Sequence, residues 1–254
     1  DAGVYIADSF TEWSGGIQNY GLIQGDKAGI QIGDFDTHSG EGGEHGDDEY
    51  SIAHDDGAGV VFSGGIFNYE GGTIVGKSGP SIAIGGASFS GGIYNDGLIT
   101  QDLGDGGEHG EYNFGGEHGD DDESPYKGVG IVVAVPTFEG GIFNDTNGQI
   151  DGLLGPAIWI TDKTQSFGGG ITNTGKIEGA NDAIRIEAEN FAGGLYNGAT
   201  GSIVATEGDG VFASSAWSGD FENHGLISGA ENGFAYVGST FAGDVRNAGA
   251  IEGG

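Results

Sequence analysis

The stretch that decides the fold is residues 167–186, FGGGITNTGKIEGANDAIRI. It opens with Phe167, continues through glycines, and reaches Asn173 six residues later. Near its end Ile184 and Ile186 flank one polar residue, an alternation that is typical of a β-strand. The glycines and asparagines between such short apolar segments mark turns. The stretch therefore predicts very short strands separated by tight turns.

The same pattern recurs eight times along the chain. The aromatic positions are Trp13, Phe62, Phe89, Phe138, Phe167, Phe191, Trp217 and Phe241. An asparagine follows each of them by six residues: Asn19, Asn68, Asn95, Asn144, Asn173, Asn197, Asn223 and Asn247. The unit reads F-x-G-G-I-x-N-x-G-x-I-x-G-(x)-A-I-x-I, which is an internal repeat.

The length of the repeat selects the architecture. Five of the seven intervals between neighbouring aromatics are 24, 24, 26, 27 and 29 residues. A propeller blade of four strands needs about 40 residues, whereas one coil of a solenoid fits in fewer. We therefore predict an all-β fold, a single parallel β-solenoid over residues 1–254 with about 8–9 coils of about 24–29 residues each.

Stacked coils give the repeated residues structural roles. The isoleucines are expected to point inward, and each aromatic is expected to stack on the aromatics above and below it. An asparagine at a fixed corner can bond to the next coil through both its amide donor and its carbonyl acceptor. The paired glycines allow the positive φ that sharp corners require. All eight asparagines are interpreted as structural residues.

Composition limits the functions that are compatible with the chain. It has 58 glycines, no cysteine, and 39 acidic against 7 basic residues, for a net charge of −32. Nucleic acids and anionic membranes need Lys and Arg to neutralise phosphates, so neither is an expected partner. The absence of cysteine excludes disulfides and thiol catalysis. No apolar run of about 18 residues occurs, so no membrane insertion is expected.

The F-x-G-G-I-x-N-x-G-x-I unit resembles the repeats of bacterial autotransporter-type passenger domains and related large surface adhesins. The resemblance covers nearly the whole chain outside two insertions. It implies an extracellular or cell-surface β-solenoid with a structural or adhesive role.

The two insertions interrupt the rhythm at about residues 33–57 and 100–127. Both contain Gly-Gly-Glu-His-Gly and runs of acids, and clustered carboxylates suit Ca²⁺, which takes six to eight oxygen ligands. The candidate metal ligands are Asp36, Glu44, Asp47, Asp48, Glu49, Asp55, Glu117, Asp120, Asp121, Asp122 and Glu123, with His45, His109 and His118. The Glu-His pairs would also suit a transition metal. A solvated acidic loop without a metal is the alternative.

The ends of the chain match each other. Residues 251–254 followed by residues 1–6 read IEGGDAGVYI, which aligns without a gap to IEGANDAIRI at 177–186. We expect the two ends to supply the halves of one coil. Either separate chains stack head to tail, or the 254 residues are one tandem unit of a longer protein.

These features favour an extracellular homo-oligomeric filament or surface layer, with lateral contacts through the acidic insertions. The alternative is a surface adhesin that binds glycans or neighbouring surfaces, with Tyr94, Tyr196 and Trp159 as outward aromatics that would contact sugar rings. A polysaccharide-degrading enzyme is a distant alternative, because catalysis on acidic sugars needs basic residues close to clustered acids. The basic residues are scattered over different repeats: Lys27, Lys77, Lys127, Lys163, Lys176, Arg185 and Arg246. We expect no enzyme.

Overall fold

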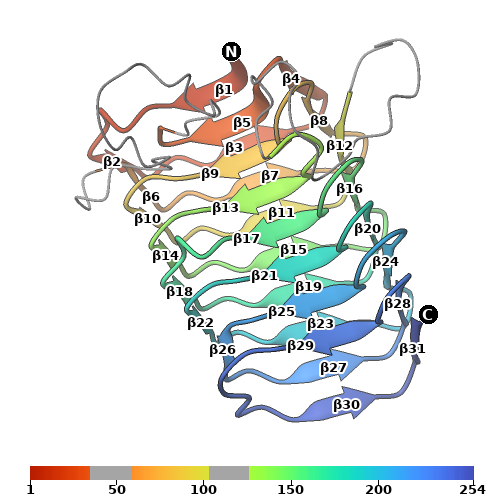
Figure 1. Cartoon of the computed structure of the whole chain (residues 1–254). Helices are drawn as coiled ribbons and strands as arrows, with labels where there is room; N and C mark the ends of the chain where they lie inside the picture. Colours follow the sequence, from red (N-terminus) through yellow and green to blue (C-terminus); the bar gives the residue numbers. More distant parts are fainter. Residues whose placement is uncertain (35–58, 103–125) are drawn as a thin grey trace, which may run out of the picture.

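The chain forms a rod of stacked coils built from four parallel sheets (Figure 1). The computed structural model describes residues 1–34, 59–102 and 126–254. Each coil contributes one strand to each side of the rod, and every strand pairs in parallel with its equivalents in the neighbouring coils. The predicted all-β parallel β-solenoid is confirmed, with eight strands in three of the sheets.

Two sheets carry the alternating isoleucines and the ladder asparagines. Sheet A contains β1 (Ala2–Ile6), β5 (Ala28–Ile32), β9 (Ile82–Ile84), β13 (Ile131–Val133), β17 (Ile158–Ile160), β21 (Ile184–Ile186), β25 (Val211–Ala213) and β29 (Phe234–Tyr236). Sheet C contains β3 (Ile17–Asn19), β7 (Ile66–Asn68), β11 (Ile93–Asn95), β15 (Ile142–Asn144), β19 (Ile171–Asn173), β23 (Leu195–Asn197), β27 (Phe221–Asn223) and β30 (Val245–Asn247).

The other two sheets complete the coil. Sheet B contains β2 (Glu12–Trp13), β6 (Val61–Phe62), β10 (Ser88–Phe89), β14 (Thr137–Phe138), β18 (Ser166–Phe167), β22 (Asn190–Phe191) and β26 (Ala216–Trp217). Phe241 continues this sheet by a single bridge to Trp217. Sheet D contains β4 (Leu22–Gly25), β8 (Thr73–Gly76), β12 (Leu98–Gln101), β16 (Gln149–Gly152), β20 (Lys176–Gly179), β24 (Ser202–Ala205), β28 (Leu226–Gly229) and β31 (Ala250–Gly253).

The register places like residues over like, as the repeat predicts. In sheet B the rings of Phe89, Phe138 and Phe167 stack at centroid distances of 4.8 and 4.7 Å, close to the strand spacing of about 4.8 Å. These side chains are fully buried with the isoleucines of the other sheets in one continuous core. Burial of apolar side chains in this core is the main stabilising term.

In five repeats the second glycine of the pair has a conformation that other residues avoid: Gly65, Gly92, Gly141, Gly170 and Gly194. Gly141 has φ +74°, and a Cβ there would lie 2.6 Å from the carbonyl oxygen of Gly169 in the next coil. The left-handed conformation and the close approach of two backbones both require glycine. This explains why the pair follows the aromatic residue in so many repeats.

The start of the second predicted insertion is part of a strand. Thr100 and Gln101 belong to β12, and Gln101 is buried. The Gln101 side-chain amide donates to Ser81 Oγ at 3.1 Å and to the Asp151 carbonyl oxygen at 2.9 Å. Residues 35–58 and 103–125 lie outside the described part. Within the described part, no helix has the length and apolar character needed to cross a membrane.

Candidate functional site

The apolar core is less covered at the two ends of the rod than in the middle, most clearly at the C-terminal end, since Ile6 (3% exposed) and Ile17 (9% exposed) of the first coil are still buried. Positions that are fully buried in inner coils are only partly covered in the end coils, which hold Val4, Trp13, Ile23, Phe234, Tyr236, Phe241 and Ile251. Val245 shows the difference most clearly: it is 57% exposed, whereas its equivalent one coil earlier, Phe221, is 0% exposed. The end coils therefore form two apolar faces, which we call the N-terminal face and the C-terminal face.

The edge strands at these faces have one free side. Among the described strands, β29 pairs only with β25, β30 only with β27, and β31 only with β28. At the other end β1, β3 and β4 each pair with one strand. A free edge presents unpaired backbone N–H and C=O groups, which can accept a further strand.

The asparagine ladder runs through all eight coils and has a direction. Each Nδ2 donates to the Oδ1 of the next asparagine at 2.8 Å, from Asn19 to Asn247. The ladder therefore ends with an amide donor at the C-terminal face and begins with a carbonyl acceptor at the N-terminal face. The Asn19 Oδ1 accepts only the Gly21 N–H, at 3.2 Å, among the described residues.

A groove of about 500 Å³ lies on the outer side of sheet C. One wall is formed by Phe67, Tyr94 and Phe143, which occupy the central, outward position of β7, β11 and β15. The other wall is the corner after the ladder asparagines and includes Asp96 and Asp145. The complete lining is Phe67, Asn68, Tyr69, Tyr94, Asn95, Asp96, Phe143, Asn144, Asp145, Thr172 and Thr174.

The local sequence explains why the groove is open. The ring edge of Phe143 leans over Gly141, within 3.1 Å of where a Cβ would be, and Phe67 leans over Gly65 in the same way. Both rings therefore tilt away from the corner and leave space between themselves and it. In the next coil the aromatic position is Thr172, so the aromatic wall stops there.

The faces of the aromatic rings are covered by one another. Tyr94 lies between Phe67, at 4.9 Å, and Phe143, at 4.8 Å, and the interplanar angles are 2° and 7°. Both faces of the Tyr94 ring are therefore covered, whereas Phe67 and Phe143 each stack on Tyr94 with one face. Contact with the face of a sugar ring needs an open aromatic face, which this wall does not offer along its length.

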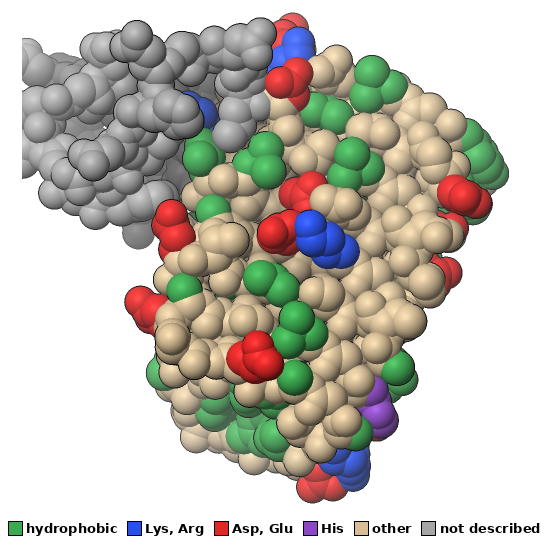
Figure 2. Space-filling model, turned by 90° about the vertical axis from the view of Figure 1, so that its right-hand side faces the viewer, with side chains coloured by type: hydrophobic (Ala, Val, Ile, Leu, Met, Phe, Trp, Pro, Cys, Tyr) green, Lys and Arg blue, Asp and Glu red, His purple; other side chains and the backbone are tan. Residues whose placement is uncertain are grey.

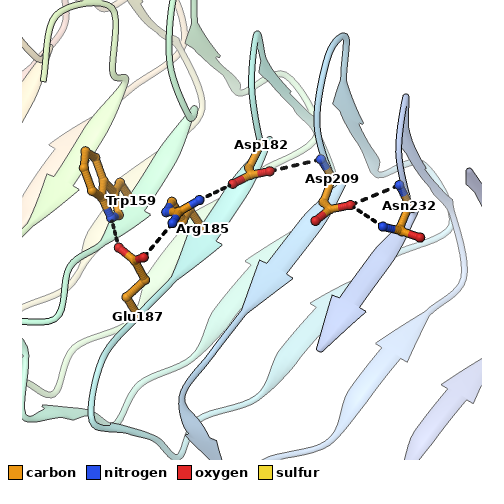
Figure 3. A network of polar contacts seen from close by, with 6 residues as sticks. All are labelled: Trp159, Asp182, Arg185, Glu187, Asp209 and Asn232. Atoms are coloured by element: carbon orange, nitrogen blue, oxygen red, sulfur yellow. Dashed lines mark hydrogen bonds and ion pairs between the residues drawn. The ribbon is translucent and has the colours of Figure 1, made fainter. Parts of the chain in front are cut away.

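Outside the groove, four basic side chains are paired with acids: Lys77, Lys176, Arg185 and Arg246. Figure 3 shows Arg185 of β21, which donates to Asp182 at 3.0 Å and to Glu187 at 2.7 Å. Partial burial lowers the pKa of the Arg185 guanidinium, but the hydrogen bonds and charges of Glu187 and Asp182 outweigh it, so the net shift is upward. Arg185 also lies over the Phe212 ring at 4.7 Å. The Arg185 guanidinium therefore stabilises the fold through these contacts and is not available to bind an anion.

Other basic residues behave similarly. Lys176 pairs with Glu178, Lys77 with Asp26, and Arg246 with Asp220 and Asp244. Figure 2 views the side of the rod where sheet D lies. Leaving aside the part next to the grey atoms, each basic side chain in this view lies beside an acidic one. The described part of the chain therefore has no free basic cluster on that face.

The predicted metal ligands all fall within residues 35–58 and 103–125, outside the described residues. The Ca²⁺ hypothesis thus stays a prediction. In the part of the chain that the structure describes, no group of three or more His, Asp or Glu side chains could hold a metal ion.

The three outward aromatics named from the sequence have different surroundings. Tyr94 belongs to the groove, Tyr196 lies beside His224 at 5.6 Å, and Trp159 donates its indole N–H to Glu187 at 2.7 Å (Figure 3). The sequence reasoning missed Phe67, Phe143, Asp96 and Asp145. The signal was available, because these residues directly follow the ladder isoleucine or the ladder asparagine of their repeats.

Compared with known protein families, with curated proteins and with solved structures, the chain has no match. The assignment as a β-solenoid rests on the coil geometry.

Proposed function

We propose that this protein is an extracellular structural solenoid, not an enzyme, that stacks head to tail into a filament or surface layer. The observation that carries the proposal is the pair of open faces: each ends the same four sheets, the same apolar core and the same asparagine ladder. The resemblance to bacterial surface repeats supports the extracellular setting. The strong negative charge of −32 would keep neighbouring rods apart in solution.

The two faces are complementary when the register of the inner coils is continued. Val245 would pair with Ile17 and Ile251 with Ile23 of the next copy, since these residues are equivalents in the repeat. Asn247 would donate to the free acceptor of Asn19 and so extend the ladder. The apolar pairing would cover surface at about 25 cal/mol per Å².

The polar groups at the faces are compatible with this register. Arg246 would meet Gln18, and Glu252 would meet Gln24, so neither of these pairs opposes like charges. A like-charged pair, Asp1 over Glu231, would lie at the corner where the two copies join. The indole Nε1 of Trp13, in the first rung of sheet B, is buried without a hydrogen-bond partner among the described residues. A further coil packed on the N-terminal face would bring backbone carbonyls close to it.

The test is sedimentation velocity of the 254-residue chain over a series of concentrations. We expect the wild type to form larger species as concentration rises, and Val245→Lys to remain monomeric because it places a charge in the apolar contact. Leu153→Lys is the matched control, since Leu153 is also exposed (45%) but lies in an inner coil. A wild type that stays monomeric at high concentration would overturn the proposal.

Ca²⁺ binding by the acidic insertions is a further part of the proposal. Binding to the folded state alone raises the melting temperature as ligand increases. Melting curves in millimolar Ca²⁺ and in EDTA should therefore differ, and coincident curves would remove this part. If the insertions do bind Ca²⁺, lateral contacts between rods through these insertions should also require Ca²⁺.

The second candidate function is surface adhesion, which the groove on sheet C favours. A groove of this size and apolar character is typical of ligand sites. A filament that displays the groove once per copy could act as an adhesin, so the two functions are compatible.

A further inference from the structure

The groove on sheet C has the shape of a slot along the rod. Its lining comes from four successive coils, Phe67 to Thr172, which at about 4.8 Å per coil corresponds to a length of about 14 Å. At one end Tyr69 stands beside Phe67, at 6.3 Å, and stacks on Tyr20 at 4.3 Å. At the other end the small side chains Thr172 and Thr174 leave it open. The slot therefore fits an extended segment that lies along the rod.

One wall of the slot is apolar. The edges of Phe67, Tyr94 and Phe143 form it, and the stacking covers both faces of Tyr94 and the faces of Phe67 and Phe143 that meet it. Such a wall fits a methylene chain, which needs apolar contact but no particular ring orientation. It fits a sugar ring poorly, for the reason given above.

The other wall carries negative charge without a counterion. The Asp96 carboxylate has no hydrogen-bond or ion-pair partner among the described residues. The Asp145 Oδ1 accepts the Thr146 N–H at 2.8 Å and the Thr146 and Thr174 hydroxyls at 3.4 Å, which leaves its second oxygen free. The two aspartates follow Asn95 and Asn144, which are direct neighbours in sheet C. They are therefore about one coil spacing apart, near 4.8 Å at the backbone.

We propose that this slot binds an extended polypeptide segment of a partner protein through a lysine or arginine side chain. The aliphatic stem lies against the aromatic edges, and the cationic head lies between Asp96 and Asp145. Long basic side chains combine an apolar stem with a charged tip in this way. The cation also separates two carboxylates that otherwise repel each other. This site does not depend on end-to-end stacking.

Charge alone would attract any polycation to a chain of net charge −32, so the test must separate the slot from general attraction. The probe is a short blocked peptide of alternating glycine and lysine, titrated by calorimetry and by the NMR signals of the Tyr94 ring. The control probe has glutamine in place of each lysine. Dilute Val245→Lys protein keeps the measurement free of assembly.

The groove variant is Asp96→Asn with Asp145→Asn. The matched control is Asp162→Asn with Glu207→Gln, which removes the same charge from two exposed positions outside the groove. Both variants must first give the wild-type circular dichroism spectrum and melting curve. If the lysine head pairs with Asp96 and Asp145, the affinity for the lysine peptide should be weaker by roughly tenfold or more in the groove variant. In the control variant this affinity should change by no more than about twofold.

The expected result is lysine-dependent binding that shifts the Tyr94 signals and is lost in the groove variant alone. Equal losses in both variants would show general attraction and overturn the proposal. Failure of the lysine peptide to shift Tyr94 would overturn it as well. So would a neutral oligosaccharide that shifts Tyr94 as strongly in the groove variant as in the wild type, because the slot would then be a glycan site.

Discussion

At the scale of single residues, the ladder asparagine joins neighbouring coils. Asn173 is fully buried and accepts from Asn144 while donating to Asn197, both at 2.8 Å. A buried side-chain amide whose N–H donor and C=O acceptor are both hydrogen-bonded stabilises the fold. A buried donor or acceptor that is left without a hydrogen bond costs about 1–3 kcal/mol. The same side chain also fixes the corner between sheets C and D, because its amide reaches the Ser202 carbonyl of the next coil.

Asn173→Ala therefore leaves buried ladder groups of Asn144 and Asn197 without partners. We expect the free energy of unfolding to fall by about 1–3 kcal/mol, measured by urea denaturation. Thr172→Ala, at the neighbouring outward position, is the control and should change it much less. Equal effects of the two substitutions would show that the ladder bonds add little.

Asp151 is a buried carboxylate that reduces stability when ionised. Burial is the main cause that raises its pKa, with hydrogen bonds from Gln149 and the charge of Lys176 acting in the opposite direction. Because the folded-state pKa lies above the unfolded one, ionised Asp151 costs stability at neutral pH, and that cost is removed as pH falls through the folded-state pKa.

Asp151→Asn should therefore raise the melting temperature at pH 7, because the neutral amide avoids the cost of the buried charge. The difference from wild type should shrink in acid and vanish below the ordinary aspartate pKa of about 3.9. Melting curves across this pH range check the prediction. If the melting temperature of the variant exceeds that of the wild type by the same amount at every pH, the stabilisation comes from packing and not from the removal of charge.

At the scale of elements, the two aromatic ladders have the same spacing and different roles. The sheet B ladder, with Phe138 at its centre, is fully buried, whereas the sheet C ladder, with Phe143, lies on the surface. Ring stacking is similar in both, at 4.7–4.8 Å for the pairs that involve these residues. Burial therefore decides which ladder stabilises the fold.

Phe138→Ala should cost about 3–5 kcal/mol, because it removes a large side chain from the core and leaves a cavity. Phe143→Ala should cost clearly less, since part of that ring is already in contact with water. Denaturation of both variants makes the comparison. A Phe143 loss as large as the Phe138 loss would mean that the outer ladder is part of the core.

The same scale shows what the sequence could and could not predict. Inward positions repeat in identity, so spacing alone predicts the roles of Phe138 and Asn173. Outward positions do not repeat: Phe67, Tyr94 and Phe143 are followed by Thr172, and the groove depends on the direction in which rings lean over Gly65 and Gly141. Ring direction is a property of packing and not of periodicity.

The boundary of the second insertion illustrates a similar limit. Gln101 extends β12 because its amide bonds to Ser81 and to the Asp151 backbone in neighbouring coils. Such contacts between coils are set by the register and are not visible in the local sequence.

At the scale of the whole molecule, the central claim is that the two open faces continue one another. Electron microscopy of concentrated protein, with Fourier analysis of any rods, tests it most directly. Eight rungs per copy at about 4.8 Å each predict straight rods with an axial repeat of about 38 Å and a strong 4.8 Å spacing along the axis. Isolated particles at every concentration, or rods whose 4.8 Å spacing runs across the axis, would contradict it.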